Sequence, residues 1–229
     1  SRGLGDVYKR QADFLEVDIV RSKLIETTTV RYGMVEGEEG IGYLQITEFD
    51  TVTLDQFNEA MAELRADDMK GLILDLRSNP GGDLSVVVEI ARRLLPAGLI
   101  TYTEVPSGQR TEYTCDGEYE IDIPMVVLIN GYSASAAEIL AGAIQDHNKG
   151  TIVGTTSYGK GIVQRLITLE DGSAVKLTVS GWFTPDGNNI QGSGIEPDVE
   201  AEYDTDLAET EGLDSQVEKG IEILKEKIG

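Results

Sequence analysis

The stretch that decides the fold is Gly71-Leu72-Ile73-Leu74-Asp75-Leu76. A short, nearly continuous apolar run is typical of a strand that is buried on both faces, as in parallel sheets. The turn that follows contains Gly81 and Gly82, and residues 85–95 then have helical character. A buried strand, a glycine turn and a helix in succession predict a unit of an α/β fold.

The alternation of strand and helix continues on both sides of this unit. Residues 53–64 place apolar side chains on one helical face, with Thr53 as the expected N-cap. The pattern predicts an α/β core of parallel-type strands and helices. Further strands are expected at residues 41–46, 124–129 and 151–154, and a further helix at residues 135–145.

The character of the sequence changes after residue 162. Residues 163–169 and 174–183 flank Asp171-Gly172, a pair that favours a tight turn, so these residues predict a β-hairpin. Residues 205–212 are acidic and polar and are expected to be a linker. Residues 214–227 carry apolar side chains at helical spacing and predict a C-terminal helix with lysines in its last turn.

The composition restricts the classes of partner. The chain has 229 residues, 40% of them hydrophobic, and a net charge of −22. This charge argues against nucleic acid and against a bare anionic membrane surface as partners. A single cysteine excludes an internal disulfide. No group of His, Cys, Asp and Glu has metal-ligand spacing, so no metal is expected.

A serine and a lysine form the most informative pair in the chain. Ser135 opens a predicted helix in the run Ser133-Ala134-Ser135-Ala136-Ala137-Glu138, and Lys160 follows it by 25 residues in Tyr158-Gly159-Lys160-Gly161. A serine hydroxyl is a weak nucleophile until a neighbouring base takes its proton, and a neutral lysine amine can do so. The pair therefore offers a nucleophile and a base without a histidine.

Each member of the pair also has a simpler interpretation. Ser135 alone would be an N-cap serine, and Ser133 competes with it for the nucleophile role. Residues 154–160 match the start of a phosphate-binding loop, although Gly161 stands where Ser or Thr should hold magnesium. Lys160 could also be a surface residue in a glycine turn. His147 is the one histidine and is expected to cap a helix end.

Backbone amides near Ser135 could stabilise a developing oxyanion. Ala136 follows Ser135 at the start of the helix, where N–H groups are free and favour negative charge. A second donor would come from Gly81 or Gly82, since glycine lets the backbone approach a ligand closely. The sequence leaves both glycines open.

Four further observations give the chain a family resemblance. The serine and lysine segments, with the 25 residues between them, resemble the carboxyl-terminal processing (tail-specific) peptidases, which are serine peptidases with a Ser-Lys dyad. The resemblance implies a core related to those of crotonase and ClpP, and it implies that Gln164 is a third member of the site. Other matching segments are residues 40–46, residues 72–82 and the segment from Thr184 to Asp198.

The resemblance implies an endopeptidase that acts through an acyl-enzyme on proteins or peptides with exposed C-termini. Ser135 would be the nucleophile and Lys160 the general base, and no cofactor is needed. Two rival hypotheses stay open. One is a catalytically silent homologue that serves as a peptide-binding scaffold, and the other is an acyl-thioester enzyme on a crotonase-like core.

The resemblance also divides the chain. Residues 12–25 are expected to be the last strand of an otherwise missing PDZ domain, residues 26–203 the peptidase core, and residues 204–229 the linker and terminal helix. Residues 1–11 are expected to be a sequencing artefact or a leader. The resemblance implies an extracytoplasmic location, because family members act outside the cytoplasm. A membrane tether upstream of the core and assembly into a homo-oligomer are further possibilities that the resemblance leaves open.

Overall fold

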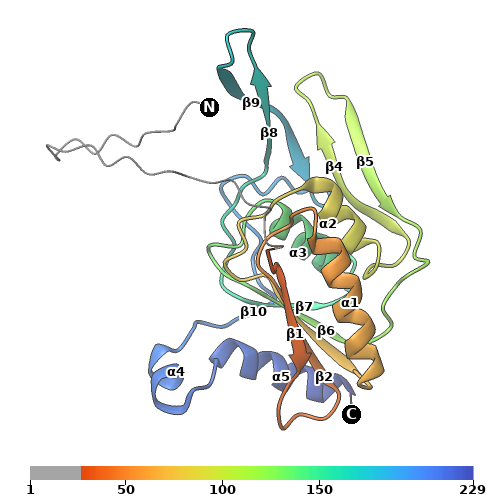
Figure 1. Cartoon of the computed structure of the whole chain (residues 1–229), viewed down its shortest axis with the longest axis vertical. Coiled ribbons are helices and arrows are strands. Elements are labelled where there is room, and N and C mark those ends of the chain that lie inside the picture. Colours follow the sequence, from red (N-terminus) through yellow and green to blue (C-terminus); the bar gives the residue numbers. More distant parts are fainter. Residues whose placement is uncertain (1–26, 229) are drawn as a thin grey trace, which may run out of the picture.

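The computed structural model describes residues 27–228, and a six-stranded sheet forms its centre (Figure 1). Its strands lie in the order β1-β2-β3-β6-β7-β10. β1 runs antiparallel to β2, and every other neighbouring pair is parallel. The strands are β1 (Val30–Met34), β2 (Ile41–Ile46), β3 (Gly71–Asp75), β6 (Met125–Ile129), β7 (Thr151–Gly154) and β10 (Val199–Glu200).

Helices cover both faces of this sheet, which explains its apolar strands. Leu72 and Leu74 face one core, shared with α1 (Thr53–Ala66), α2 (Leu84–Ala91) and α3 (Ala136–Asp146). Ile73, between them, faces a second core under α5 (Ser215–Ile228), where it packs with Ile221 and Leu224. Because neighbouring residues of a strand point to opposite faces, a strand between two helical layers must be apolar at every position.

A second, antiparallel sheet stands at one end of the molecule, in the order β5-β4-β9-β8. Its hairpins project away from the end that holds α4 and α5 (Figure 1). Trp182 is fully buried where this sheet meets the core. The strands are β4 (Gly98–Glu104), β5 (Arg110–Cys115), β8 (Ile162–Thr168) and β9 (Ala174–Phe183).

The structure confirms the α/β class, the expected strands, the β8–β9 hairpin and the C-terminal helix. Three details were wrong. The helix expected at residues 85–95 ends at Ala91. Thr53 is the first residue of α1 rather than its N-cap, because its hydroxyl donates to the Glu48 carbonyl and accepts from the Asp50 amide. No strand had been predicted for β1, β4, β5 or β10.

The third correction concerns the expected linker, which contains the helix α4 (Thr205–Glu211). None of its residues is buried, so apolar periodicity could not reveal it. Local capping stabilises it instead. The Asp204 side chain accepts from the Leu207 amide at 3.0 Å, and Gly212 ends the helix in the left-handed conformation with φ 71°.

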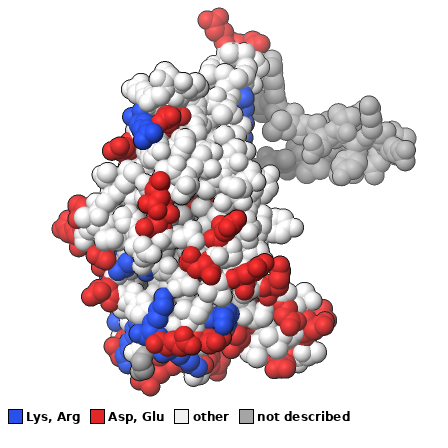
Figure 2. All heavy atoms as spheres, turned by 180° about the vertical axis from the view of Figure 1, so that it is seen from behind, with Lys and Arg blue, Asp and Glu red and all other residues white. Residues whose placement is uncertain are grey.

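The expectations for residues 1–25 lie outside the described residues. None of the helices in residues 27–228 is both long and apolar enough to cross a membrane. Acidic side chains are spread over the face in Figure 2 and are dense at the end that holds α4 and α5, in keeping with the net charge of −22.

Candidate active site

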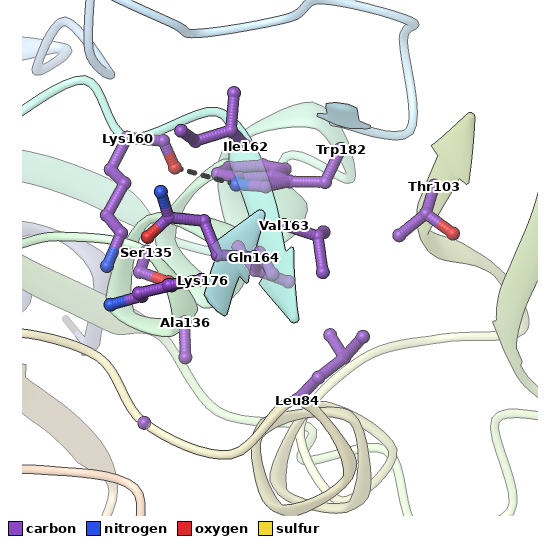
Figure 3. Close-up of a pocket in the computed structure, with 12 residues that line it drawn as sticks. Leu84, Thr103, Ser135, Ala136, Lys160, Ile162, Val163, Gln164, Lys176 and Trp182 are labelled. Atoms are coloured by element: carbon purple, nitrogen blue, oxygen red, sulfur yellow. Dashed lines mark hydrogen bonds between the residues drawn. The ribbon is translucent and has the colours of Figure 1, made fainter. Parts of the chain in front are cut away.

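A cavity of about 210 Å³ lies where the helices α2 and α3 meet the antiparallel sheet. It brings together five of the six residues that the sequence had singled out, from segments far apart in the chain (Figure 3). Gly81, the sixth, lies next to the cavity against the Ser135 side chain. The five residues that line it are Gly82, Ser135, Ala136, Lys160 and Gln164.

Ser135 occupies the N-cap position of α3, and its amide donates to the Glu138 carboxylate at 2.7 Å, as in a capping box. Its backbone has φ 56° and ψ −115°, a conformation that costs an ordinary residue about 1–3 kcal/mol. Such strain is typical of functional sites, including sharp strand-to-helix turns that expose a nucleophile. The N-cap interpretation therefore holds, and the same serine also lines the cavity.

Ser133, the competing serine, is fully buried and occupied. Its hydroxyl donates to the Leu76 carbonyl at 2.8 Å and accepts from the Asn130 amide at 3.0 Å. These bonds fasten the loop before α3 to the end of β3. Ser133 thus supports the loop that carries Ser135, and it does not line the cavity.

Lys160 lies in the loop between β7 and β8, and its side chain reaches toward Ser135 (Figure 3). It is half-buried. The Trp182 indole N–H donates to the Lys160 carbonyl at 2.8 Å and fixes the backbone there. Within residues 27–228 no hydrogen bond joins the Ser135 hydroxyl to the Lys160 amine. Catalytic hydrogen bonds often tighten only when substrate binds.

Gln164 lies in β8, four residues after Lys160, and also lines the cavity. Its amide can accept a hydrogen bond from an amine or donate one to a substrate carbonyl. A second lysine, Lys176 of β9, points its amine at the same space as Lys160 (Figure 3). Sequence reasoning missed Lys176, because only the pairing of β8 with β9 brings it to the site.

The structure distinguishes the two glycines that the sequence left open. The Gly81 amide donates to the Asn79 side-chain oxygen at 2.8 Å, so it is already used. Gly82 lines the cavity together with Ala136. Gly81 instead gives room to the nucleophile, because a Cβ at this position would lie 2.8 Å from the Ser135 Cβ. Its φ of +103° also favours glycine.

Most of the remaining wall of the cavity is apolar, although Thr103 and Lys176 also line it. Leu84 of α2, Ile139 of α3, Val163 of β8 and Trp182 of β9 face the same space as Ser135. Such a wall can take the apolar side chain of a peptide, and burial of an apolar side chain contributes about 1.5–3 kcal/mol.

The phosphate-binding interpretation does not fit the structure, whereas His147 caps a helix end as expected. The Gly159 and Lys160 amides, which a phosphate would need, already donate to the carboxylate of Glu138. His147 ends α3, and its Nε2 lies 2.8 Å from the Leu99 carbonyl, away from the cavity. Among the described residues no group of three or more His, Cys, Asp or Glu side chains could hold a metal ion.

Glu138 is the second residue that sequence reasoning missed. It is fully buried three residues after Ser135, and it contacts both the serine and the lysine segments. A signal was present, since Ser-x-x-Glu at a helix start is the pattern of a capping box.

Fold and cavity together define a class: α/β proteins with a strained serine at a helix start and a lysine directed toward it. Residues 40–201 match Peptidase family S41, and the chain belongs to this family. It is similar to a solved photosystem II D1 C-terminal processing protease, with a TM-score of 0.72 and 32% identity. That match covers 87% of this chain and 53% of the other.

Curated relatives of the chain are also carboxy-terminal processing proteases. The chain is 40% identical to a carboxy-terminal-processing protease of Bartonella bacilliformis, over 86% of this chain and 48% of the relative. It is 38% identical to the carboxy-terminal processing protease CtpA of Bacillus subtilis, over 78% of this chain and 38% of the relative. The chain thus spans less than half the length of these two relatives.

Proposed function

We propose that the chain is the catalytic core of a serine endopeptidase in which Ser135 is the nucleophile and Lys160 the general base. The observation that carries the proposal is the cavity itself. It combines a strained serine, a lysine directed toward it and a mostly apolar wall. Membership of Peptidase family S41 supports the reaction class.

In the proposed mechanism the neutral Lys160 amine takes the Ser135 proton as the hydroxyl oxygen attacks the scissile carbonyl. The Ala136 and Gly82 amides stabilise the oxyanion, and the helix start adds favourable polarity. Lysine then gives its proton to the leaving amine, which departs and leaves an acyl-enzyme. Lys160 next takes a proton from water, the water oxygen attacks the ester, and the Ser135 hydroxyl is restored. Gln164 orients the lysine amine.

The substrates in this proposal are unstructured proteins or peptides with exposed C-termini. The support comes from the relatives, which are named for carboxy-terminal processing. An extracytoplasmic place of action belongs to the same proposal, and one relative, from Tetradesmus obliquus, is named as chloroplastic.

The test is incubation of the 229-residue chain with an unstructured protein in water enriched in ¹⁸O, followed by mass analysis. Endopeptidase activity predicts internal fragments whose new C-termini carry ¹⁸O. A peptide with a free C-terminus should be cut faster than the same peptide with a C-terminal amide. An intact substrate would contradict the activity, and turnover of an acyl-thioester instead would favour a crotonase-type reaction.

A further inference from the structure

Glu138 is a carboxylate sealed inside the protein next to the proposed dyad. Its exposure is 0%, and it lies in the first turn of α3. Oε1 accepts from the Ser157 hydroxyl at 2.5 Å and from the Gly159 amide at 2.6 Å. Oε2 accepts from the Ser135 amide at 2.7 Å and from the Lys160 amide at 2.9 Å. Both oxygens are therefore saturated.

Neutral groups donate all four of these bonds. Three donors are backbone N–H groups, which can only donate. The fourth is the Ser157 hydroxyl, whose oxygen accepts from the Ile195 amide at 2.7 Å and whose proton is free to point at Glu138. No ion pair in residues 27–228 involves Glu138. Hydrogen bonds from neutral groups thus offset the cost of its burial.

The bonds connect two segments whose relative position the chemistry needs. One is the strained backbone of Ser135, and the other is the loop of Gly159 and Lys160, with φ 85° at Gly159. A shift of about 1 Å between nucleophile and base can cost roughly 10²-fold in rate. Through Ser157 the same carboxylate is joined to Ile195, so a third segment supports it.

We propose that Glu138 is the positioning residue of the Ser135–Lys160 pair: its buried carboxylate holds the nucleophile's turn and the lysine's loop at a fixed distance. The inference rests on the proposed peptidase function. It extends that function, because Glu138 touches neither substrate nor the reacting atoms and acts only through the backbone of the two residues that do.

The first variant is Glu138→Gln, which keeps the shape of the side chain and replaces one acceptor oxygen by an NH₂ group. That group would face N–H donors, so the tie between the two segments breaks. We expect kcat to fall by about 10²-fold while KM stays within about twofold, because the substrate-binding wall is unchanged.

The second variant, Ser157→Ala, removes only the hydroxyl that donates to Glu138. It keeps the proposal testable if Glu138→Gln does not fold. Its matched control is Tyr43→Phe, which also deletes a hydroxyl that donates to a fully buried carboxylate. The Tyr43 hydroxyl donates to Asp75 at 2.6 Å, away from the cavity, and burial raises the pKa of Tyr43. We expect kcat to fall roughly tenfold in Ser157→Ala and to stay at the parent value in Tyr43→Phe.

Hydrogen exchange gives a readout that does not depend on activity. The Ser135, Gly159 and Lys160 amides donate to Glu138, so they should exchange roughly tenfold faster in Ser157→Ala than in Tyr43→Phe. Equal exchange in the two variants would overturn the positioning role. Equal kcat, in a parent chain that cleaves peptides, would also overturn it and leave the proposed function standing. A parent chain that cleaves nothing refutes the proposed function alone, and exchange then decides this inference.

Discussion

At the scale of single residues, Ser135 is held in a conformation that it would not adopt alone. Its φ of 56° costs about 1–3 kcal/mol, and three neighbours maintain it. Ser133 fastens the preceding loop, and Glu138 accepts a hydrogen bond from the Ser135 amide. Gly81 leaves room for the Ser135 Cβ. The surroundings therefore over-determine the turn and present the hydroxyl to the cavity.

Two lysines line the cavity that holds this hydroxyl, and we propose different roles for them. Lys160→Arg should lower kcat/KM by at least about 10²-fold, because a guanidinium does not give up its proton and cannot act as a base. Lys176→Arg should keep kcat within about threefold, since the site needs only one base. Steady-state cleavage of one fluorogenic peptide by both variants gives the comparison. Loss of kcat in the Lys176 variant with retention in the Lys160 variant would exchange the two roles.

The residues that the sequence revealed are those with a local signal. Ser135 and Lys160 stand in recognisable runs, and Gln164 follows at a fixed spacing. Lys176 has no such signal, because it reaches the cavity only through the register in which Leu166 pairs with Lys176. The choice between Gly81 and Gly82 needed the Asn79 side chain, whose contact no sequence pattern predicts.

At the scale of elements, α2 begins at the glycine turn beside the site and is capped by Asp83. The Asp83 carboxylate accepts from the Ser85 amide at 2.7 Å, from the Val86 amide at 3.3 Å and from the Ser85 hydroxyl. The hydrogen bond from the Ser85 hydroxyl, the largest cause, lowers the pKa of Asp83. Capping thus fixes the helix that follows Gly82, the glycine proposed for the oxyanion site.

The cap predicts both a stability cost and a pH dependence. Asp83→Ala should lower the free energy of unfolding by about 1 kcal/mol at pH 7. Because folding lowers the pKa of Asp83, its contribution is present above its unfolded value near 4 and is lost as pH falls through the folded value. Asp83→Asn keeps the cap without titrating. Urea unfolding at pH 7 and pH 3 should show the parent losing more stability than Asp83→Asn, and equal losses would contradict this.

Elements were predictable where burial imposes a pattern. β3 and β6 are buried at every position, and their apolar runs predicted them. α4 carries no buried residue and depends on its caps, so an acidic composition suggested a linker instead. β5 is exposed at four of its six positions, which leaves little apolar alternation to detect.

At the scale of the whole molecule, the sheet holds the site on one face and is braced from the other. Arg77, just after β3, pairs with the buried Asp75 and, at 2.8 Å, with Asp214 at the start of α5. The same guanidinium donates to Gln216 at 2.8 Å. The terminal helix is thus tied to the strand that leads into the glycine turn, by an ion network and by the apolar contacts of Ile221 and Leu224.

The charge of the molecule predicts a salt dependence. With a net charge of −22, the protein attracts cationic peptides and repels anionic ones over distances of about one Debye length. At low salt KM should be lower for a Lys-rich peptide than for a Glu-rich peptide with the same cleavage sequence. Raising NaCl from about 20 mM to about 500 mM should bring the two KM values together. A difference that persists unchanged would place the discrimination in the cavity rather than in the overall field.

The central claim is that Ser135 is the nucleophile, and one comparison of peptide-cleavage rates tests it most directly. Ser135→Ala should lose at least about 10³-fold in kcat while remaining folded. Ser133→Ala is the matched control. It leaves the Asn130 amide without its Ser133 acceptor and removes one of the two donors to the Leu76 carbonyl, and so should lose about 1–3 kcal/mol of stability but remain an active enzyme. Cleavage by Ser135→Ala near the parent rate, with loss of cleavage in a folded Ser133→Ala, would contradict the account.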